Sequence, residues 1–442
     1  MTDILAARTQ MGMSLAFHIV FAVLGIGMPV MLLLAEGLWL RTGDREYYRL
    51  ARTWSKAFAI LFAVGAVSGT ILSFELGLLW ADFMAFAGAI IGLPFALEGY
   101  AFFIEAIFLG LYLYGWSRLS PVAHWLSAFP IAVSGALSGV FVVTANAWMN
   151  TPAGFRLEDG VVVAVDPWAA MWNPAAVPEA GHMLLSAYIA TGFAVAAVYA
   201  GAVLRGHTTA YNRRGLVLGM LVGGLTILPQ LVWGDYLARF VAATQPAKLA
   251  AMEGQFETER GAPLRIGGIP DTERRETPYA IEIPRGLSWL AFDDPNAEVV
   301  GLNAFPPDEQ PNPVIVHLSF QAMVGGGFYL LGVAAAWAVA TWKRREPRWL
   351  LRLIVAAGPV AFLAIEAGWF VTEFGRQPWI IQGIMKVGPA VSEVPGLTAT
   401  LIGYSLIYGF LALTLVWLLL RLAAQAPRDS THGGQRDAGD AA

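Results

Sequence analysis

Long apolar segments alternate with polar loops along almost the whole chain. A membrane-spanning helix needs roughly 20 mostly apolar residues in succession. Segments that meet this need lie near residues 12–40, 54–79, 93–116, 123–149, 180–205, 215–241, 313–342, 350–374 and 397–422. The first of them is longer than the apolar part of a secretory signal, so we expect the chain to retain it. The pattern predicts an all-α integral membrane protein with nine transmembrane helices.

The polar segments divide the chain into four parts. Residues 1–241 hold the first six predicted spans, residues 242–312 form a long loop, residues 313–422 hold the last three spans, and residues 423–442 form a polar tail. The composition of the tail predicts disorder. Within the loop, apolar and charged positions alternate over residues 279–284, which predicts a short strand. A loop of this length is more often functional than idle.

Positive side chains gather in alternate loops, and this pattern orients the spans. The first and seventh loops carry Arg41, Arg45, Arg49, Arg52, Lys56, Lys343, Arg344, Arg345, Arg348 and Arg352. The short segments on the opposite side carry Arg8, Arg156, Arg376 and Lys386. Cytoplasmic loops of membrane proteins are enriched in lysine and arginine. We therefore expect the N-terminus and the long loop outside, and the C-terminus in the cytoplasm.

Composition narrows the function further. Of the 442 residues, 57% are hydrophobic and 14% are charged, and the formal net charge is −4. These values exclude a typical soluble enzyme and give no sign of a nucleic-acid partner. The chain contains no cysteine. Disulfides, iron–sulfur clusters and covalently attached haem are therefore excluded within it.

Two histidines and a methionine stand where a membrane protein could bind a metal or a haem. His18 lies within the first span, where it could hydrogen-bond a neighbouring helix or serve as a metal, haem or proton-relay group. His182 opens the fifth span, where a histidine near the interface costs little. Met323 precedes Gly325–Gly327, and such a run of glycines lets a bulky group approach a helix. Histidine and methionine together are a known axial pair for low-spin haem.

Two glutamates lie within the third span. Glu98 and Glu105 are seven residues apart, which places them on one helical face. Carboxylates inside a membrane are costly and are usually functional. Their mutual repulsion and their burial favour the protonated form, which suits a proton carrier.

A second set of polar residues ends the eighth span. Glu366, Trp369 and Glu373 recur at one-face spacing, and Gly375 then ends the helix. Glu373 could form a structural ion pair with Arg376 at the helix end, or it could bind a metal.

Depth groups the candidate residues. With the predicted orientation and a rise of about 1.5 Å per residue, the outer part of the membrane holds His18, Glu98, His182, Met323 and Glu373. Transporters more often bind substrate near the midplane. An outer layer beneath the long loop instead favours chemistry on a substrate that the loop binds. A haem–copper centre would need about six intramembrane histidines, whereas only His18 and His182 are well placed.

The other polar residues near span ends carry weaker expectations. We expect His124, His207 and His317 to be interfacial. Glu75, near the outer end of the second span, is either interfacial or functional.

Five motifs connect these residues to a known family. They are GRQPW at 375–379, ALEGYAFFIEAIFLG, VTANAWMNTP, KLAAMEGQFET and EAGWF. With nine spans, they resemble subunit I of cytochrome bd-type quinol oxidases over about residues 5–422. The short sixth loop is similar to the short-loop branch of that family.

The resemblance implies a haem-containing terminal oxidase. Such an enzyme oxidises quinol at the outer face and reduces O2 to water with cytoplasmic protons, and it generates a proton motive force without pumping. The implied cofactors are a low-spin haem b, a high-spin haem b, and either haem d or a second high-spin haem b. The implied partner is a homologous membrane subunit II, and a small single-span subunit is also allowed. The implied location is the plasma membrane of a bacterium or archaeon.

The resemblance also assigns iron ligands. His182 and Met323 match the axial ligands of the low-spin haem. His18 and Glu373 match the axial ligands of the two high-spin haems, in an order that the residues leave open.

Further residues match groups around the haems. Glu98 and Glu105 match acids beside the oxygen site and its proton path. Trp369 and Arg376 match groups packed against the haem pair, where Arg376 could bind propionates bidentately.

The remaining matches lie toward the outer face. Arg8 is a further expected cofactor-binding residue, and Asn146 matches a polar residue near the low-spin haem or the quinol region. Lys248 and Glu253 match residues of the quinol-binding loop.

Three features depart from the family pattern. Gln321 stands where the family has an arginine, and loss of that charge would change the potential of the low-spin haem. Glu98 and Glu105 are seven residues apart rather than eight, which puts one of the two matches in doubt. Glu179, three residues before His182, is also unusual.

Two other functions compete with the oxidase. A proton-coupled transporter would use the same buried carboxylates without haem. A haem protein could also pass electrons from quinol to an acceptor other than O2.

Overall fold

Nine long helices dominate the computed structural model, which describes residues 3–392 and 396–425. They are α1 (Asp3–Thr42), α2 (Arg45–Leu79), α3 (Ala81–Gly115), α4 (Pro121–Asn150), α6 (Ala176–Leu204), α7 (Ala210–Thr244), α10 (Pro313–Trp342), α11 (Arg348–Arg376) and α13 (Leu397–Gln425). All nine are long and apolar enough to cross a membrane. The all-α fold with nine spans is confirmed, and the inside–outside orientation stays a prediction from the loop charges. Most of the predicted polar tail lies outside the described residues.

Side-chain caps set the start of several helices. The capping residues are Asp44 for α2, Ser120 for α4, Thr209 for α7 and Asn312 for α10. Each side chain accepts a hydrogen bond from a backbone N–H in the first turn, which has no partner within the helix. The caps lie in the polar segments, so α2 begins at Arg45 and α7 at Ala210, ahead of the apolar segments predicted from residues 54 and 215.

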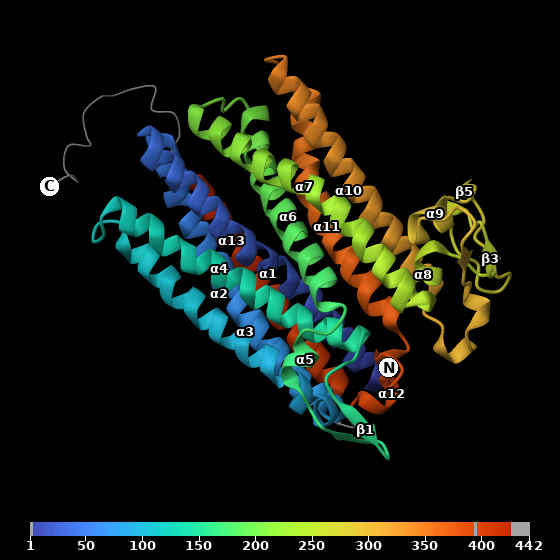
Figure 1. Cartoon of the computed structure of the whole chain (residues 1–442). Helices are drawn as coiled ribbons and strands as arrows, with labels where there is room; N and C mark the ends of the chain where they lie inside the picture. Colours follow the sequence, from blue (N-terminus) through green and yellow to red (C-terminus); the bar gives the residue numbers. More distant parts are fainter. Residues whose placement is uncertain (1–2, 393–395, 426–442) are drawn as a thin grey trace, which may run out of the picture.

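Helices that are consecutive in the sequence pack as pairs. The pairs are α1 with α2, α3 with α4, α6 with α7, and α10 with α11. Figure 1 shows α1–α4 on one side and α6, α7, α10 and α11 on the other. Contacts of α1 and α4 with α6 join the two groups, and α13 packs on α1 and α2. The largest apolar core lies between the groups and includes Trp54, Phe58 and Phe193.

Glycine allows one pair to approach closely. A Cβ added to Gly192 on α6 would lie 2.3 Å from the backbone nitrogen of Gly223 on α7. A Cβ added to Gly219 would lie 2.6 Å from the backbone nitrogen of Ala196. Small residues at such crossings let two membrane helices pack backbone to backbone.

The long loop between α7 and α10 folds beside the helix ends (Figure 1). Its elements are α8 (Pro246–Glu253), β3 (Glu259–Arg260), β4 (Leu264–Gly267), β5 (Ala280–Ile283), α9 (Gly286–Phe292), β6 (Glu298–Val299), η1 (Leu302–Ala304) and η2 (Pro307–Glu309). Strand β4 pairs antiparallel with β5, and Leu264 lies opposite Ile283. Strand β3 pairs with β6. The strand predicted within residues 279–284 is therefore confirmed and corresponds to β5.

Two smaller segments cover the same end of the molecule. Between α4 and α6 lie β1 (Arg156–Glu158), β2 (Val161–Val163) and α5 (Pro167–Met171). Between α11 and α13 lie β7 (Trp379–Ile381), β8 (Met385–Lys386) and α12 (Val387–Ala390). Lys386 forms an ion pair with Asp308 of the long loop at 2.6 Å, which holds the segment to the loop.

Three polar residues near span ends are buried inside the protein: His124, His317 and Glu75. His124 is 2% exposed and His317 is 0% exposed, because both ring nitrogens of each have hydrogen-bond partners inside the protein. Glu75 is 1% exposed and accepts a hydrogen bond from the side-chain amide of Gln10. The interfacial depth expected for His124 and His317 stays a prediction, whereas their side chains are buried inside the protein. His207 is exposed, as expected.

Candidate functional site

His18 is fixed between α1 and α2. Its Nδ1 lies 2.9 Å from the hydroxyl of Ser68, which is itself 3.0 Å from the carbonyl of Val64. When the hydroxyl donates to that carbonyl, it accepts from His18 Nδ1–H, and Nε2 keeps a free lone pair. Metal-binding histidines commonly use one nitrogen for such a second contact. A Cβ added to Gly69 would come within 2.9 Å of the ring, so only glycine leaves room for it. Nothing in the sequence singled out Ser68.

Glu98 and Glu105 both face α4. Glu98 hydrogen-bonds the side chain of Ser138. Oε1 of Glu105 would lie 3.2 Å from a Cβ added to Gly135, one turn away on α4. The one-face prediction for the two glutamates is confirmed by this arrangement. Oε1 of Glu105 is buried without a hydrogen-bond partner, as expected of a group that exchanges protons or contacts water.

Glu373 lies in a cluster built by α4 and α11. Its Oε2 accepts a hydrogen bond from Nη2 of Arg376 at 2.8 Å, and its Oε1 accepts one from the side-chain amide of Asn146. The predicted ion pair with Arg376 therefore exists. The packing of α4 presents Asn146 to the end of α11, where it contacts Glu373. The expected place of Asn146 near the low-spin haem or the quinol region stays a prediction.

Lys248 joins the same cluster from the long loop. Its ammonium group donates to the side-chain carbonyl of Asn150 at 2.7 Å, and Asn150 also donates to Glu179 at 3.3 Å. Burial lowers the pKa of Lys248 to about 8; the carboxylates of Glu179 and Glu373 oppose this shift. Lys248 thus points away from the loop surface and toward Glu373. Asn150 was missed, because nothing in the sequence pairs it with a lysine 98 positions away.

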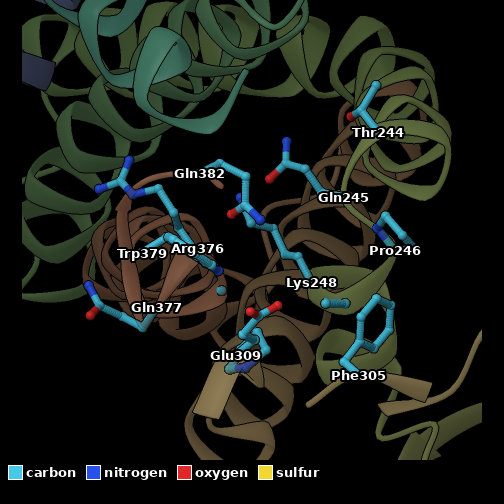
Figure 2. Close-up of a pocket in the computed structure, with 13 residues that line it drawn as sticks. Thr244, Gln245, Pro246, Lys248, Phe305, Glu309, Arg376, Gln377, Trp379 and Gln382 are labelled. Atoms are coloured by element: carbon cyan, nitrogen blue, oxygen red, sulfur yellow. The ribbon is translucent and has the colours of Figure 1, made fainter. Parts of the chain in front are cut away.

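A polar pocket opens beside this cluster. It has a volume of about 180 Å³ and is lined by the ends of α7 and α11, by α8, and by residues of the loops on either side. Figure 2 shows Arg376, Lys248 and Gln245 around it. Nε and Nη1 of Arg376 and both polar atoms of the Gln245 side chain are buried without hydrogen-bond partners. Buried polar atoms are normally paired, so this end of the cluster is suited to a ligand with oxygen acceptors. Arg8, exposed at the same end, donates to Gln377 at 3.3 Å.

His182 and Met323 lie on α6 and α10. One amide nitrogen of Gln230 is 3.3 Å from both ring nitrogens of His182, so neither nitrogen has a strong, exclusive partner. The sulfur of Met323 would lie 3.0 Å from a Cβ added to Gly368 on α11. A Cβ added to Gly327, one turn from Met323, would have nothing within 4 Å. The glycine run therefore leaves open space beside the methionine, as the sequence predicted.

The base of the long loop is tied to α10. Both ends of the Gln321 side-chain amide bond to strand β4: Oε1 accepts from the N–H of Gly267, and Nε2 donates to the carbonyl of Arg265, each at 3.0 Å. His317 bonds the carbonyls of Met252 and Gly267. Gln321 thus clamps the backbone of the loop to α10.

Glu253 ends α8 at this base. The side chain is 4% exposed, and its Oε2 has no hydrogen-bond partner. Burial raises the pKa of Glu253 to about 8, against the opposing positive charge of Arg265. A carboxyl group with such a pKa can accept and release a proton near neutral pH.

The side chains proposed as metal ligands fit haem better than they fit a bare metal ion. Within residues 3–392 and 396–425, no group of three or more His, Cys, Asp or Glu side chains could hold a metal ion. Haem iron takes its equatorial ligands from the macrocycle and needs one or two axial ligands from the protein. His18, His182, Met323 and Glu373 are single candidates of that kind. The unpaired nitrogens of Arg376 fit propionate carboxylates.

The remaining acidic and aromatic candidates lie nearby on α11. Trp369 is partly buried and packs against the main core. Oε1 of Glu366 is buried without a partner. Glu366, Trp369 and Glu373 follow the predicted face, and Glu366 still has no specific role.

Comparisons with known proteins identify the family of the chain. A family model described as "Cytochrome bd terminal oxidase subunit I" matches residues 6–427. The chain is 39% identical over 436 residues to the "Putative cytochrome bd menaquinol oxidase subunit I" of Bacillus subtilis (strain 168), covering 97% of this chain and 98% of that protein. It is 31% identical over 451 residues to the "Cytochrome bd ubiquinol oxidase subunit 1" of the same organism, covering 98% and 96%. Among solved structures, that of bd oxidase from Geobacillus thermodenitrificans matches with a TM-score of 0.91 and 39% identity, over 96% of this chain and 99% of that one.

Proposed function

Because the chain belongs to the cytochrome bd terminal oxidase subunit I family and is subunit I of a membrane quinol oxidase, we propose which of its residues perform each part of the reaction. As subunit I it is a haem protein, and it works in a complex with other subunits. We identify the partner as a homologous subunit II. A small single-span subunit is a further candidate. The plasma membrane of a bacterium or archaeon is its proposed location.

Four side chains hold the haems in this proposal. His182 and Met323 bind a low-spin haem b, and His18 and Glu373 bind the two high-spin haems, a haem b and either haem d or a second haem b. The haems supply electron transfer and the reduction of O2 to water. Support comes from the free Nε2 of His18, the open space at Gly327, and the absence of any multi-ligand metal cluster among the described residues.

The residues around Glu373 orient and neutralise the site. Arg376 and Asn146 each donate to a different oxygen of Glu373, which fixes the plane of its carboxylate. The other two nitrogens of Arg376 are free to bind propionates. Lys248 adds a positive charge that compensates Glu179 and Glu373 when it is protonated. Trp369 packs behind the pair and excludes water.

The base of the long loop handles quinol in this proposal. Glu253 accepts a proton from the quinol hydroxyl and releases it to the outer side, for which a pKa of about 8 is suitable. Lys248 lies five residues earlier on the same helix, and it links the loop to the Glu373 cluster. A shift of α8 on quinol binding is thereby transmitted through Lys248 to the residues that hold the haems.

Protons for O2 reduction come from the opposite side of the membrane. Glu105 passes them along α4 toward Glu98, whose carboxyl group contacts Ser138. Quinol protons are released outside and consumed protons enter from the cytoplasm, so the reaction builds a proton motive force without a pump.

The observation that carries the assignment is the set of single haem-ligand side chains on the membrane helices, of which His18 and Glu373 are each oriented by a hydrogen-bond partner. A transporter without haem would need no such set. A reduced-minus-oxidised visible spectrum of the purified complex should show haem bands, and quinol should support O2 consumption. Absence of haem bands would overturn the oxidase assignment; bands without O2 consumption would indicate transfer to another acceptor.

A further inference from the structure

Three polar side chains form a closed cluster among α1, α3 and α4, and Glu36 contributes from the last two turns of α1, beyond His18. Glu36 is 0% exposed, Tyr112 is 0% exposed, and His124 is 2% exposed. The Tyr112 hydroxyl donates to Oε2 of Glu36 at 2.7 Å, and Nδ1 of His124 lies 2.6 Å from Oε1 of Glu36. Nε2 of His124 lies 2.8 Å from the backbone carbonyl of Tyr112. A buried carboxylate that closes such a network in an apolar bundle is costly unless it serves a purpose.

The partners of His124 show how many protons the cluster holds. Both ring nitrogens face oxygen acceptors, and a carbonyl oxygen can never donate. Nε2 must therefore carry a hydrogen, and a second proton must lie between Nδ1 and Oε1 of Glu36. That proton belongs either to an imidazolium or to a carboxylic acid. Its removal leaves two lone pairs facing each other, so the cluster is favoured in the loaded form.

The cluster lies one turn inside the end of the bundle with the arginine-rich first loop. Glu36 is six residues before the end of α1, Tyr112 is three before the end of α3, and His124 is in the first turn of α4. The positive-inside rule places this end in the cytoplasm. Trp116 covers the cluster, with its ring centroid 4.0 Å from that of His124. From α2, the guanidinium of Arg52 lies over the Trp116 ring, 5.0 Å from its centroid.

The same helix seam leads to Glu105. Tyr112 and Glu105 are seven residues apart on α3, which is about 10 Å along one face. A Cβ added to Gly135 of α4 would lie 3.2 Å from Oε1 of Glu105 and 3.2 Å from the carbonyl oxygen of Gly25 of α1, so α1, α3 and α4 come together here as they do at the cluster. Two or three water molecules in single file would span about that distance. Oε1 of Glu105 is buried without a partner and is free to receive the proton.

We propose that Glu36 and His124 form a proton-loading station that supplies Glu105 from the cytoplasmic side. The station releases the proton between Oε1 of Glu36 and Nδ1 of His124 toward Glu105, and it takes up another from the aqueous side past Trp116. Neither residue touches a reacting atom, so both act through Glu105. The proposal rests on the proposed function, in which Glu105 carries protons for O2 reduction.

The test is Glu36→Gln in the purified complex with its partner subunit. Glutamine can accept from Tyr112 and donate to Nδ1 of neutral His124, so every hydrogen bond is kept while the exchangeable proton is lost. Quinol-supported O2 consumption should fall about tenfold or more, within the range that a lost proton-transfer group produces. The fall should be steeper at higher pH, whereas haem spectra and the rate of haem reduction by quinol should match the wild type. Glu46→Gln is the matched control, since Glu46 at the same end pairs with Arg49 on the surface.

Wild-type O2 consumption and an unchanged pH profile in Glu36→Gln would overturn the proposal. If that variant does not assemble with haem, Tyr112→Phe provides the second test. Loss of the hydroxyl removes the hydrogen bond that orients the Glu36 carboxylate toward His124, so quinol-supported O2 consumption should fall while the rate of haem reduction by quinol stays unchanged. Wild-type O2 consumption in Tyr112→Phe would equally count against the station. Failure of the proposed function is distinguishable, because it would remove haem bands or O2 consumption from the wild type itself.

Discussion

The side-chain amide of Asn146 on α4 donates a hydrogen bond to Oε1 of Glu373 on α11, 227 positions later in the chain. Together with Arg376, which bonds Oε2, this contact engages both oxygens of the carboxylate. Groups that orient a metal ligand in this way are often as important as the ligand.

Replacement of Asn146 should therefore disturb one high-spin haem. In Asn146→Leu, Glu373 loses a donor and its carboxylate can rotate, so we expect O2 consumption to fall about ten- to a hundredfold. The visible spectrum should change in the high-spin bands and keep the low-spin band. The exposed Asn296→Leu in the long loop is the control. A shift confined to the low-spin band would contradict the place of Asn146 beside Glu373.

Met323→Leu should remove the low-spin haem signal alone. Leucine has a similar volume, so packing against Gly368 is largely kept while the sulfur ligand is lost. The rate at which quinol reduces the haems should then fall, and the high-spin bands should remain. Met183→Leu is a matched control, because Met183 is next to His182 in sequence but its methyl group faces Gly139 on α4. Retention of the low-spin band in Met323→Leu would rule out Met323 as an axial ligand.

The pKa of Glu253 predicts a pH dependence. It is raised from 4.5 to about 8, so the folded state binds more protons than the unfolded state between these values. The free energy of unfolding should therefore decrease as the pH rises from about 4.5 to 8, and Glu253→Gln should remove this decrease. Thermal unfolding of the complex across that range measures the effect, with Glu298→Gln on the loop surface as control.

The rate of quinol oxidation should also depend on the ionisation of Glu253, but it should increase as the pH rises. Only the ionised carboxylate can accept a proton, so wild-type turnover should rise with pH up to about 8. Glu253→Gln should be slow and should lack this rise. An unchanged pH profile of quinol oxidation in the variant would exclude Glu253 as the proton acceptor.

Gln321 should hold the long loop to the membrane helices. Gln321→Ala removes both bonds to β4, each worth about 1 kcal/mol. We expect faster proteolysis within residues 242–312 and a higher KM for quinol, with haem spectra unchanged. Ser405→Ala, on the exposed face of α13, serves as the control. Equal cleavage rates in the two variants would show that the clamp does not stabilise the loop.

The nine spans and the residue types that can bind haem iron were predictable from the sequence alone. Length and apolarity are local properties, and a histidine or glutamate within an apolar run stands out without any knowledge of its neighbours. The face shared by Glu98 and Glu105 was also accessible, because helical periodicity is local. The strand at residues 280–283 followed from the same kind of local alternation.

Which of these residues meet is visible only in the folded chain. The contact of Asn146 with Glu373 was not expected, and Ser68, Asn150 and Glu36 were not singled out at all. Their partners lie on other helices, and the rotation of one helix against another depends on packing across the whole bundle. Lys248 shows the same limit, since a lysine in a polar loop gives no local sign that it turns inward to Asn150, 98 positions away. A single sequence specifies each helical face, and only the folded bundle shows what each face contacts.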